Sequence, residues 1–238
     1  MLSGAMQLSP FDIAKTSSTR DVQLGQIGVT PDGRAFRFAL AGASDLSPGK
    51  LAVAATITAN HENMAVAAAA SVGATSVTVT LGATAATENQ YAGGFLIIND
   101  AAGEGTAYLV SGHPAADSAA SLEVTLAEPI RVALTTSSEA TLQKNPWDSA
   151  VISATDQGDK AVGIPVVTIA AGKYGWLQTR GLCSALADET LAVGSALTIG
   201  TGVAGALEVL DAAGEQYVGD AIQAGVDTEY RGVYLRLD

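Results

Sequence analysis

The chain has 238 residues, of which 48% are hydrophobic and only 15% are charged, and its formal net charge is −12. An acidic chain of this kind repels nucleic-acid phosphates, so we expect no nucleic-acid partner. The longest apolar runs fall short of the ~20 residues of a membrane-spanning helix, and the first residues lack the basic and apolar regions of a secretory signal. We therefore expect a protein made in the cytoplasm, with no membrane partner.

The first 27 residues show neither a two-residue nor a helical periodicity. This pattern predicts an extended N-terminal arm, residues 1–27, that needs a partner surface to become ordered. Charge also sets the beginning of the chain apart, because residues 1–50 hold five cations and four anions while the remainder holds seven and twenty. A loosely held first strand explains the same observations equally well.

Strand-like alternation begins at Ile27, and Asp32-Gly33 between two alternating runs predicts a β-hairpin. The alanine-rich stretch 60–74 predicts a short helix, with Asn60 or Asn63 as its N-cap, although an irregular β-connection also fits. Alternating segments bounded by turn residues follow, among them "TSVTVTL", "GGFLIIND", "GTAYLVSG" and "SLEVTLAEPI". This spacing predicts a β-rich domain over residues 28–148.

Turn-forming residues cluster over residues 145–160, which predicts a domain boundary there. About seven further strands with glycine corners follow, and they predict a small β-barrel-like domain over residues 149–238. The expected fold class is all-β, with antiparallel sandwich or barrel domains, an extended N-terminal arm and at most one short helix.

The segment "GKYGWLQTRGLCSAL", residues 172–186, concentrates unusual side chains. Tyr174 and Trp176 alternate in a predicted strand and share one face, so we expect Trp176 to fill a core rather than to anchor a subunit contact. Cys183 is the only cysteine, which excludes an intrachain disulfide. Its apolar surroundings predict a small buried hydrophobe rather than a reactive thiol.

Two glycine motifs suggest nucleotide binding, and both fail on context. Gly200, Gly202 and Gly205 match the dinucleotide fingerprint, with Asp220 downstream, but too few residues follow for the required βα units. We expect these glycines to serve turns instead. The stretch "GASDLSPGKL" differs from a phosphate loop in its glycine spacing, and Leu51 stands where a metal-binding hydroxyl belongs.

The sequence shows no catalytic constellation. His61 and His113 lie at no metal-ligand spacing, and His113 falls in a stretch typical of a solvent-exposed loop. Acidic residues gather in "DAAGEG", "DQGD" and "DAAGE", where turn chemistry explains them and calcium stays an open alternative. We therefore predict no enzyme, no catalytic residue, no cofactor and no metal site.

Three segments carry a resemblance to a known family: "DGRAFRFALAGASDLSPGKL", "AVGIPVVTIAAGKYGWLQTRG" and "YVGDAIQAGVDTEYRGVYLRL". Together they resemble the head decoration, or cement, proteins of tailed bacteriophages, from about residue 28 onward, with "YGWLQTRG" as the most specific element. The resemblance implies a non-enzymatic virion protein on the outer capsid surface. It also implies the major capsid protein as partner and a β-rich homo-oligomer, often a trimer.

We expect the N-terminal arm and the "RAFRF" hairpin to face the capsid or a neighbouring protomer, because an arm that orders on binding buries surface and bridges subunits. The candidate contact residues are Phe11, Arg20, Arg34, Phe36, Arg37 and Phe38. A head fibre, tail or baseplate subunit shares these features. A carbohydrate-binding β-module is a further alternative, which the 5% aromatic content disfavours.

Overall fold

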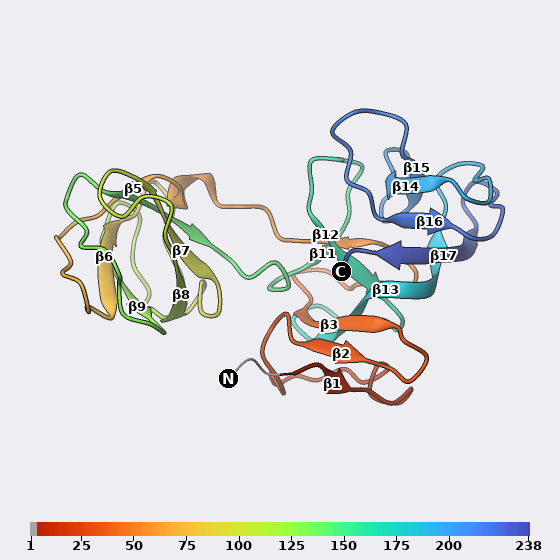
Figure 1. The fold of residues 1–238 in the computed structure, drawn as a ribbon, viewed down its shortest axis with the longest axis horizontal. Coiled ribbons are helices and arrows are strands. Elements are labelled where there is room, and N and C mark those ends of the chain that lie inside the picture. The colour runs from red at the N-terminus through yellow and green to blue at the C-terminus, as the bar shows by residue number, and fades with distance from the viewer. Residues whose placement is uncertain (1–3) are drawn as a thin grey trace. The chain divides into compact units, whose positions relative to one another are not determined.

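The computed structural model describes residues 4–238 and divides the chain into two compact units (Figure 1). Unit 1 combines the residues up to Ala55 with Pro146–Asp238, and unit 2 is the intervening Thr56–Asn145. The described residues are almost entirely strands and turns, so the predicted all-β class is confirmed. Among residues 4–238, no helix is both long enough and apolar enough to cross a lipid bilayer.

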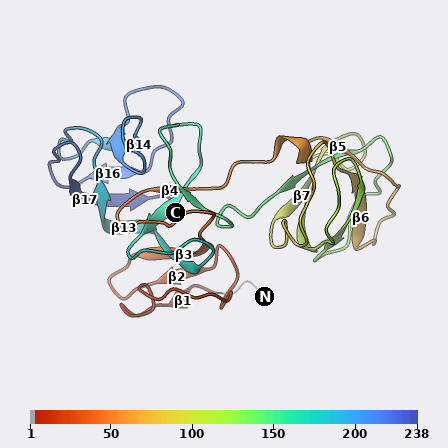
Figure 2. The ribbon, with the colours of Figure 1, turned by 180° about the vertical axis from the view of Figure 1, so that it is seen from behind.

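Unit 1 is built on a large, mainly antiparallel sheet. Its strands are β1 (Met6–Gln7), β2 (Ile27–Val29), β3 (Ala35–Leu40), β4 (Ala52–Val53), β11 (Val151–Ile152), β12 (Ala161–Pro165), β13 (Tyr174–Leu186), β14 (Ala196–Ile199), β15 (Leu207–Val209), β16 (Gly219–Ala221) and β17 (Tyr230–Arg236). The short strand β4 pairs with both β11 and β12, and Figure 2 shows it from behind. Only the β1–β2 pair is parallel among the named strand pairs of the described chain.

The long strand β13 joins the two halves of unit 1. Its first half pairs with β3 and β12, and its second half pairs with β17. The change of partner coincides with a β-bulge between Gln178 and Arg180, followed by Gly181 at a φ of 91°. A bulge bends a strand and increases its twist, and a residue at this φ is most easily a glycine. The bend therefore lets one strand serve two sheet regions.

The second half of β13 begins a small barrel. The strand order β13–β17–β16–β14–β15 returns to the end of β13, because Asp188 N donates to Leu207 O at 2.9 Å and Ala187 bridges Leu207. Inward-facing residues such as Cys183, Leu197, Leu207, Val233 and Leu235 fill it. Barrel character was predicted for the C-terminal part of the chain, and strands β13 to β17 have it.

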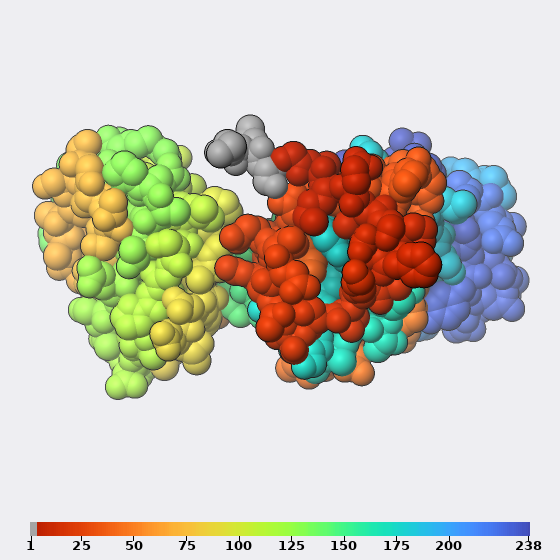
Figure 3. Space-filling model, turned by 90° about the horizontal axis from the view of Figure 1, so that it is seen from below, coloured from red at the N-terminus to blue at the C-terminus, as the bar shows by residue number. Residues whose placement is uncertain are grey.

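The N-terminal segment packs against unit 1, contrary to the prediction of an arm that needs a partner to become ordered. Leu8 and Ile13 are buried in a cluster with Phe36, Phe38 and Trp176. A side chain on Gly28 would collide with Leu8, so this glycine leaves room for it. In Figure 3 the red N-terminal segment lies over the cyan part of unit 1. Apolar burial together with the pairing of β1 and β2 holds a segment that lacks any periodic pattern.

Unit 2 is a closed six-stranded barrel. Its elements are the 3₁₀ turn η1 (Ala59–His61), β5 (Met64–Ala65), β6 (Ser76–Thr80), β7 (Phe95–Asp100), β8 (Ala107–Gly112), β9 (Ser121–Leu126) and β10 (Glu139–Gln143). The sheet order β5–β10–β7–β8–β9–β6 closes because Ala67 N donates to Thr78 O at 2.8 Å. Alternate residues such as Val77, Val79, Leu122 and Val124 point inward, as the two-residue period predicts.

The predicted helix over residues 60–74 is wrong. Only the turn Ala59–His61 is helical, Asn63 has a φ of 50°, and the alanine-rich stretch follows the barrel wall as β5 and isolated bridges. Met64 and Val66 are buried on the barrel side, so a period of two burying apolar side chains outweighs the helix propensity of alanine.

The compact units differ from the predicted domains. The boundary at Asn145/Pro146 falls inside the predicted seam of residues 145–160. However, residues 28–55 belong with the C-terminal part and not with residues 56–145, because β3 pairs with β13 and β4 pairs with β12. Pairing across more than 100 residues leaves no local mark in the sequence.

Replacing Leu8 by alanine should destabilise unit 1 by about 2–4 kcal/mol, because it opens a cavity beside Trp176. Both tryptophans of the chain, Trp147 and Trp176, lie in unit 1, so urea unfolding followed by tryptophan fluorescence reports on this unit. Met6→Ala is the matched control, since Met6 lies on the same segment and is 37% exposed. Equal unfolding midpoints for the two variants would contradict a packed N-terminal segment.

Candidate functional site

The six predicted contact residues do not form one surface. Phe36 and Phe38 are buried, and the Phe38 ring meets Trp176 edge-on at a centroid distance of 5.2 Å. They therefore present no surface to a partner. The prediction that these two residues make contacts is wrong, because both are core residues. Trp176 itself is only 6% exposed, which confirms the core position predicted for it.

Arg37 stabilises unit 1 from within. Its guanidinium donates from Nε and Nη2 to the two carboxylate oxygens of Asp238, at 3.0 and 2.8 Å, and from Nη1 to Gly25 O at 2.8 Å. It also lies over the Trp147 ring, 4.9 Å from the centroid. A fork with this many contacts ties three distant segments together.

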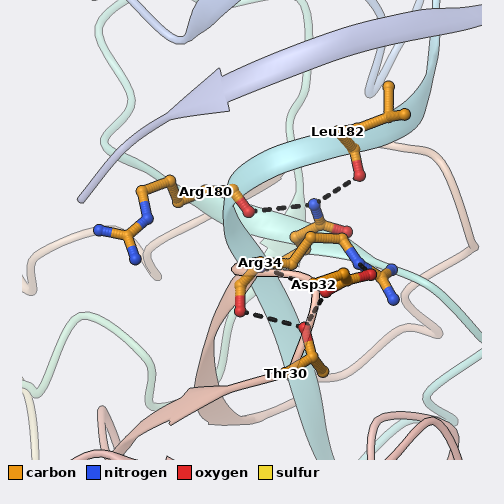
Figure 4. A network of polar contacts seen from close by, with 6 residues as sticks. Thr30, Asp32, Arg34, Arg180 and Leu182 are labelled. Atoms are coloured by element: carbon orange, nitrogen blue, oxygen red, sulfur yellow. Dashed lines mark hydrogen bonds and ion pairs between the residues drawn. The ribbon is translucent and has the colours of Figure 1, made fainter.

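Phe11, Arg20 and Arg34 remain open to solvent to different degrees. Phe11 is 81% exposed and Arg20 is exposed, while Arg34 is partly buried. Arg34 Nε donates to Asp32 Oδ2 at 2.8 Å in the turn before β3, and Thr30 caps the same turn (Figure 4). These three residues stay candidates for contact, although they do not form one patch with Phe36 and Phe38.

Cys183 is buried inside the small barrel, as predicted. Burial raises the pKa of its thiol to about 12, because the thiolate would lose its hydration there. The nearby Arg34 charge acts in the opposite direction and is outweighed. The thiol therefore stays protonated and unreactive at neutral pH.

The glycines of the dinucleotide-like motif accommodate the chain's own carboxylates. Gly202 N donates to Asp188 Oδ2 at 2.6 Å, and a side chain at Gly200 or Gly202 would press on Asp188. Thr201 N donates to Glu208 Oε2 at 2.9 Å. Of the three glycines, only Gly205 has a positive φ, so the turn explanation holds there and close approach explains the other two.

Both histidines are buried in unit 2, which contradicts the prediction of a surface position for His113. His61 Nδ1 is hydrogen-bonded to the Tyr91 hydroxyl, and its Nε2 lies 3.0 Å from Thr84 O. His113 Nε2 accepts from Tyr91 N at 3.1 Å, while Nδ1 lies 2.8 Å from Pro114 O. Because a carbonyl can only accept, each ring places its N–H on the carbonyl side and accepts at the other nitrogen. The two histidines thus both contact Tyr91 and hold loops of unit 2 against the barrel.

Within residues 4–238, no three His, Cys, Asp or Glu side chains lie close enough together to bind a metal ion. The acidic turns use their carboxylates locally. Gly158 N donates to Asp156 Oδ1 at 2.9 Å, and Asp211 N donates to Glu215 Oε2 at 3.1 Å. Turn chemistry thus accounts for these contacts.

An apolar and aromatic surface covers the outside of the small barrel. Leu182 of β13, Tyr234 of β17 and Asp220 of β16 lie opposite one another in register, whereas their neighbours Cys183, Val233 and Ala221 point inward. Exposed side chains extend this row on both sides. We call the surface the tyrosine face and define it by Leu182, Val193, Tyr217, Ile222, Tyr230 and Tyr234.

Polar contacts fix the geometry of the tyrosine face. The Tyr217 hydroxyl donates to Asp220 Oδ1 and Arg236 Nε donates to Asp220 Oδ2, both at 2.7 Å. The Tyr217 hydrogen bond, together with Arg236, holds the pKa of the Asp220 carboxyl below its ordinary value, although slight burial acts against them. Arg236 also lies over the Tyr234 ring, 5.2 Å from its centroid. The aromatic ring and the guanidinium are thus oriented before any partner arrives.

The tyrosine face is hollowed beside Tyr234. A depression of about 440 Å³ is lined by Val193, Ile222, Tyr234 and Arg236, among others. Tyrosine and arginine are enriched among the residues that contribute most to protein–protein binding, especially next to a pocket. The arrangement suits contact with another protein surface.

The sequence did not indicate the tyrosine face, although "EYRGVYLRL" carried a signal. In this strand Val233 and Leu235 alternate with Tyr230, Gly232, Tyr234 and Arg236, so both sides of the strand are apolar or aromatic. A one-sided strand would place ordinary polar residues on the outside. Which exposed side chains of this strand lie beside Leu182 and Ile222 depends on strand register, so it becomes visible only in the fold.

Comparison with known proteins identifies no relative: no family model, curated protein or solved structure matches the chain.

Replacing Tyr91 by phenylalanine should destabilise unit 2 by about 1–3 kcal/mol, since His61 Nδ1 loses its buried donor. Thermal unfolding followed by near-ultraviolet circular dichroism measures this effect. Tyr217→Phe is the control, because its hydroxyl is on the surface of unit 1. An unchanged melting temperature for Tyr91→Phe would contradict a stabilising hydrogen bond between Tyr91 and His61.

The Arg37–Asp238 pair should make unit 1 sensitive to acid. Burial acts to raise the pKa of the Asp238 carboxyl, but hydrogen bonds from Arg37 and Thr179 and the Arg37 charge outweigh it and leave the pKa lowered. A lowered carboxyl pKa stabilises the fold above the unfolded value of about 4, and this contribution is lost as the pH falls through the folded pKa.

The variant Asp238→Asn should therefore show a flatter decline of the unit 1 urea midpoint between about pH 5 and about pH 2 than the parent chain. Tryptophan fluorescence again reports on unit 1, and Asp227→Asn in an exposed turn serves as control. Parallel pH profiles for the parent and Asp238→Asn would show that the ion pair does not contribute.

Proposed function

We propose that the chain is a non-enzymatic virion structural protein that decorates and stabilises the outside of a tailed-phage capsid and binds there as a homo-oligomer, with a trimer favoured. The resemblance of "YGWLQTRG" and its companion segments to cement proteins motivates the proposal. In unit 1 this motif forms the first part of strand β13 and its bend, around which both sheet regions are arranged. The major capsid protein is the expected partner.

The tyrosine face is the observation that supports this function most directly. It exposes six large apolar or aromatic side chains on a β-scaffold, and contiguous surfaces of this kind are characteristic of protein contacts. Because Asp220 and Arg236 are already ordered by ion pairing, binding would fix few additional side chains. A protein that occupies many identical sites benefits from such a rigid contact surface.

The N-terminal segment has a different role from the one expected. Leu8 and Ile13 are part of the unit 1 core, so deletion of the first 25 residues would test folding rather than capsid contact. Phe11 and Arg20 are the exposed members of this segment and can still contact a neighbour without unfolding it. Two competing contact surfaces on unit 1 can therefore be tested by point substitutions.

The double variant Tyr234→Ser, Ile222→Ser should lower occupancy on purified capsids at least about tenfold if the tyrosine face makes the contact. Occupancy is measured by co-sedimentation and by particle reconstruction. Phe11→Ser combined with Arg20→Ala is the matched control on the N-terminal segment, and both variants are checked for unchanged thermal unfolding. Loss in the control alone would move the contact to the N-terminal segment, and loss in neither would reject both surfaces.

A head fibre, tail or baseplate subunit is the second candidate, because the same exposed face would serve any symmetric virion assembly. Particle reconstruction separates the two, since a decoration protein follows the capsid lattice and a tail or baseplate subunit does not.

A further inference from the structure

A second hollow of unit 1, distinct from the depression beside Tyr234, lies along one edge of β13. It has a volume of about 660 Å³, within the range of about 300–1,000 Å³ of ligand sites. Its lining includes Arg34, Gln178, Leu182, Ser184 and Arg231, and we call it the β13 groove. Two observations, a free strand edge and unpaired buried polar atoms, indicate what it can bind.

The backbone of β13 presents a partly unpaired edge to the groove, at Ser184. Antiparallel strands direct alternate residues toward opposite neighbours. Leu186 N donates to Gly49 O, while Ala187 N donates to Glu229 O on the β17 side, so the groups of Leu182 and Ser184 point away from β17. On that side β3 ends at Ala35, opposite Arg180, and no described strand continues it past Gly181.

Gln178 fills part of the place that a neighbouring strand would take. Its Nε2 donates to Arg180 O at 3.1 Å and to Leu182 O at 2.9 Å, as Figure 4 shows for the two carbonyls. A carbonyl oxygen can only accept, so the amide atom of Gln178 that contacts both carbonyls must be the nitrogen Nε2. The other amide atom is therefore the oxygen Oε1. Gln178 is completely buried, and Oε1 has no hydrogen-bond partner within residues 4–238.

Arg231 adds an unpaired donor to the same groove. Its Nη2 pairs with Glu229 and its Nη1 donates to Tyr230 O at 3.2 Å, whereas its buried Nε has no partner among the described residues. Both side chains with an unpaired buried atom thus line the groove, where the N–H and C=O groups of Ser184 point away from β17. An unpaired buried polar atom is uncommon and calls for a partner.

We propose that the β13 groove binds an extended peptide segment of a partner protein, which adds as a short strand to the free edge of β13 between Gly181 and Leu186. An extended backbone carries alternating N–H and C=O groups at the spacing the edge requires. Gln178 and Arg231 line the same groove, so a bound segment lies against both side chains. Because Leu182 O and Leu186 N are already paired, the free part of the edge is centred on Ser184 and accommodates about two or three residues. This inference is independent of the capsid role.

The probe is the acetylated and amidated pentapeptide Thr-Val-Thr-Val-Thr, titrated into isotope-labelled full-length protein and followed by amide chemical shifts. We expect saturable shifts at the Leu182 and Ser184 amides and at the Gln178 side-chain amide. The same peptide methylated on every backbone nitrogen should bind at least about tenfold more weakly, because it cannot donate to the edge. Equal binding of both peptides, or no shift at Ser184, overturns the proposal.

Substitution of Ser184 gives an independent test on the protein side. Ser184→Pro removes the free N–H without breaking the β17 ladder, and Ser184→Ala keeps it. Binding should fall at least about tenfold in the first and stay unchanged in the second. If Ser184→Pro does not fold, the methylated peptide on the parent protein decides the question.

A groove that is filled by a second copy of this chain gives a different result. Amide protection at Ser184 and the mass in solution would then rise together with protein concentration in the absence of peptide. That outcome overturns the assignment to a partner peptide. The capsid occupancy of the Tyr234→Ser, Ile222→Ser variant is measured without the probe, so failure of one proposal leaves the other testable.

Discussion

The bend of β13 is the constraint on which unit 1 depends. One strand must pair with β3 and β12 through its first half and with β17 through its second half. The bulge after Gln178, together with Gly181, makes this possible. The bend also ends the pairing with β3 and leaves the following edge without a strand. A feature needed for the fold thus creates the groove, because a strand that changes partners exposes backbone groups where the old partner stops.

The polar groups of unit 1 fall into two classes that differ in how completely they are paired. The carboxylates of Asp188 and Glu208 accept from backbone N–H groups of the loop after β14, which closes a motif that would otherwise suggest anion binding. Gln178 Oε1 and Arg231 Nε are buried without such a partner. Complete internal pairing argues for a structural role, whereas an unpaired buried group costs free energy that a ligand can recover.

The strand β17 shows how core and contact surface can share one element. Val233 and Leu235 point into the barrel, while Tyr230 and Tyr234 on the other side belong to the tyrosine face. Because the strand is held by its neighbours β13 and β16, the exposed rings are presented on a rigid support. The tyrosine face is the surface that we propose for contact with the larger assembly.

The sequence by itself determined the all-β class, the strands of strict alternation such as Ser76–Thr80 and Ser121–Leu126, the buried state of Trp176 and Cys183, and the boundary near residue 145. These features depend on local periodicity and turn chemistry, which neighbouring residues carry. Tertiary structure alone decided that Leu8 completes an aromatic core, that His113 is buried beside Tyr91, and that residues 28–55 join the C-terminal strands. It also decided which side chains meet on the tyrosine face and where the edge of β13 stays free. Long-range register and burial set these outcomes, and no short segment encodes them.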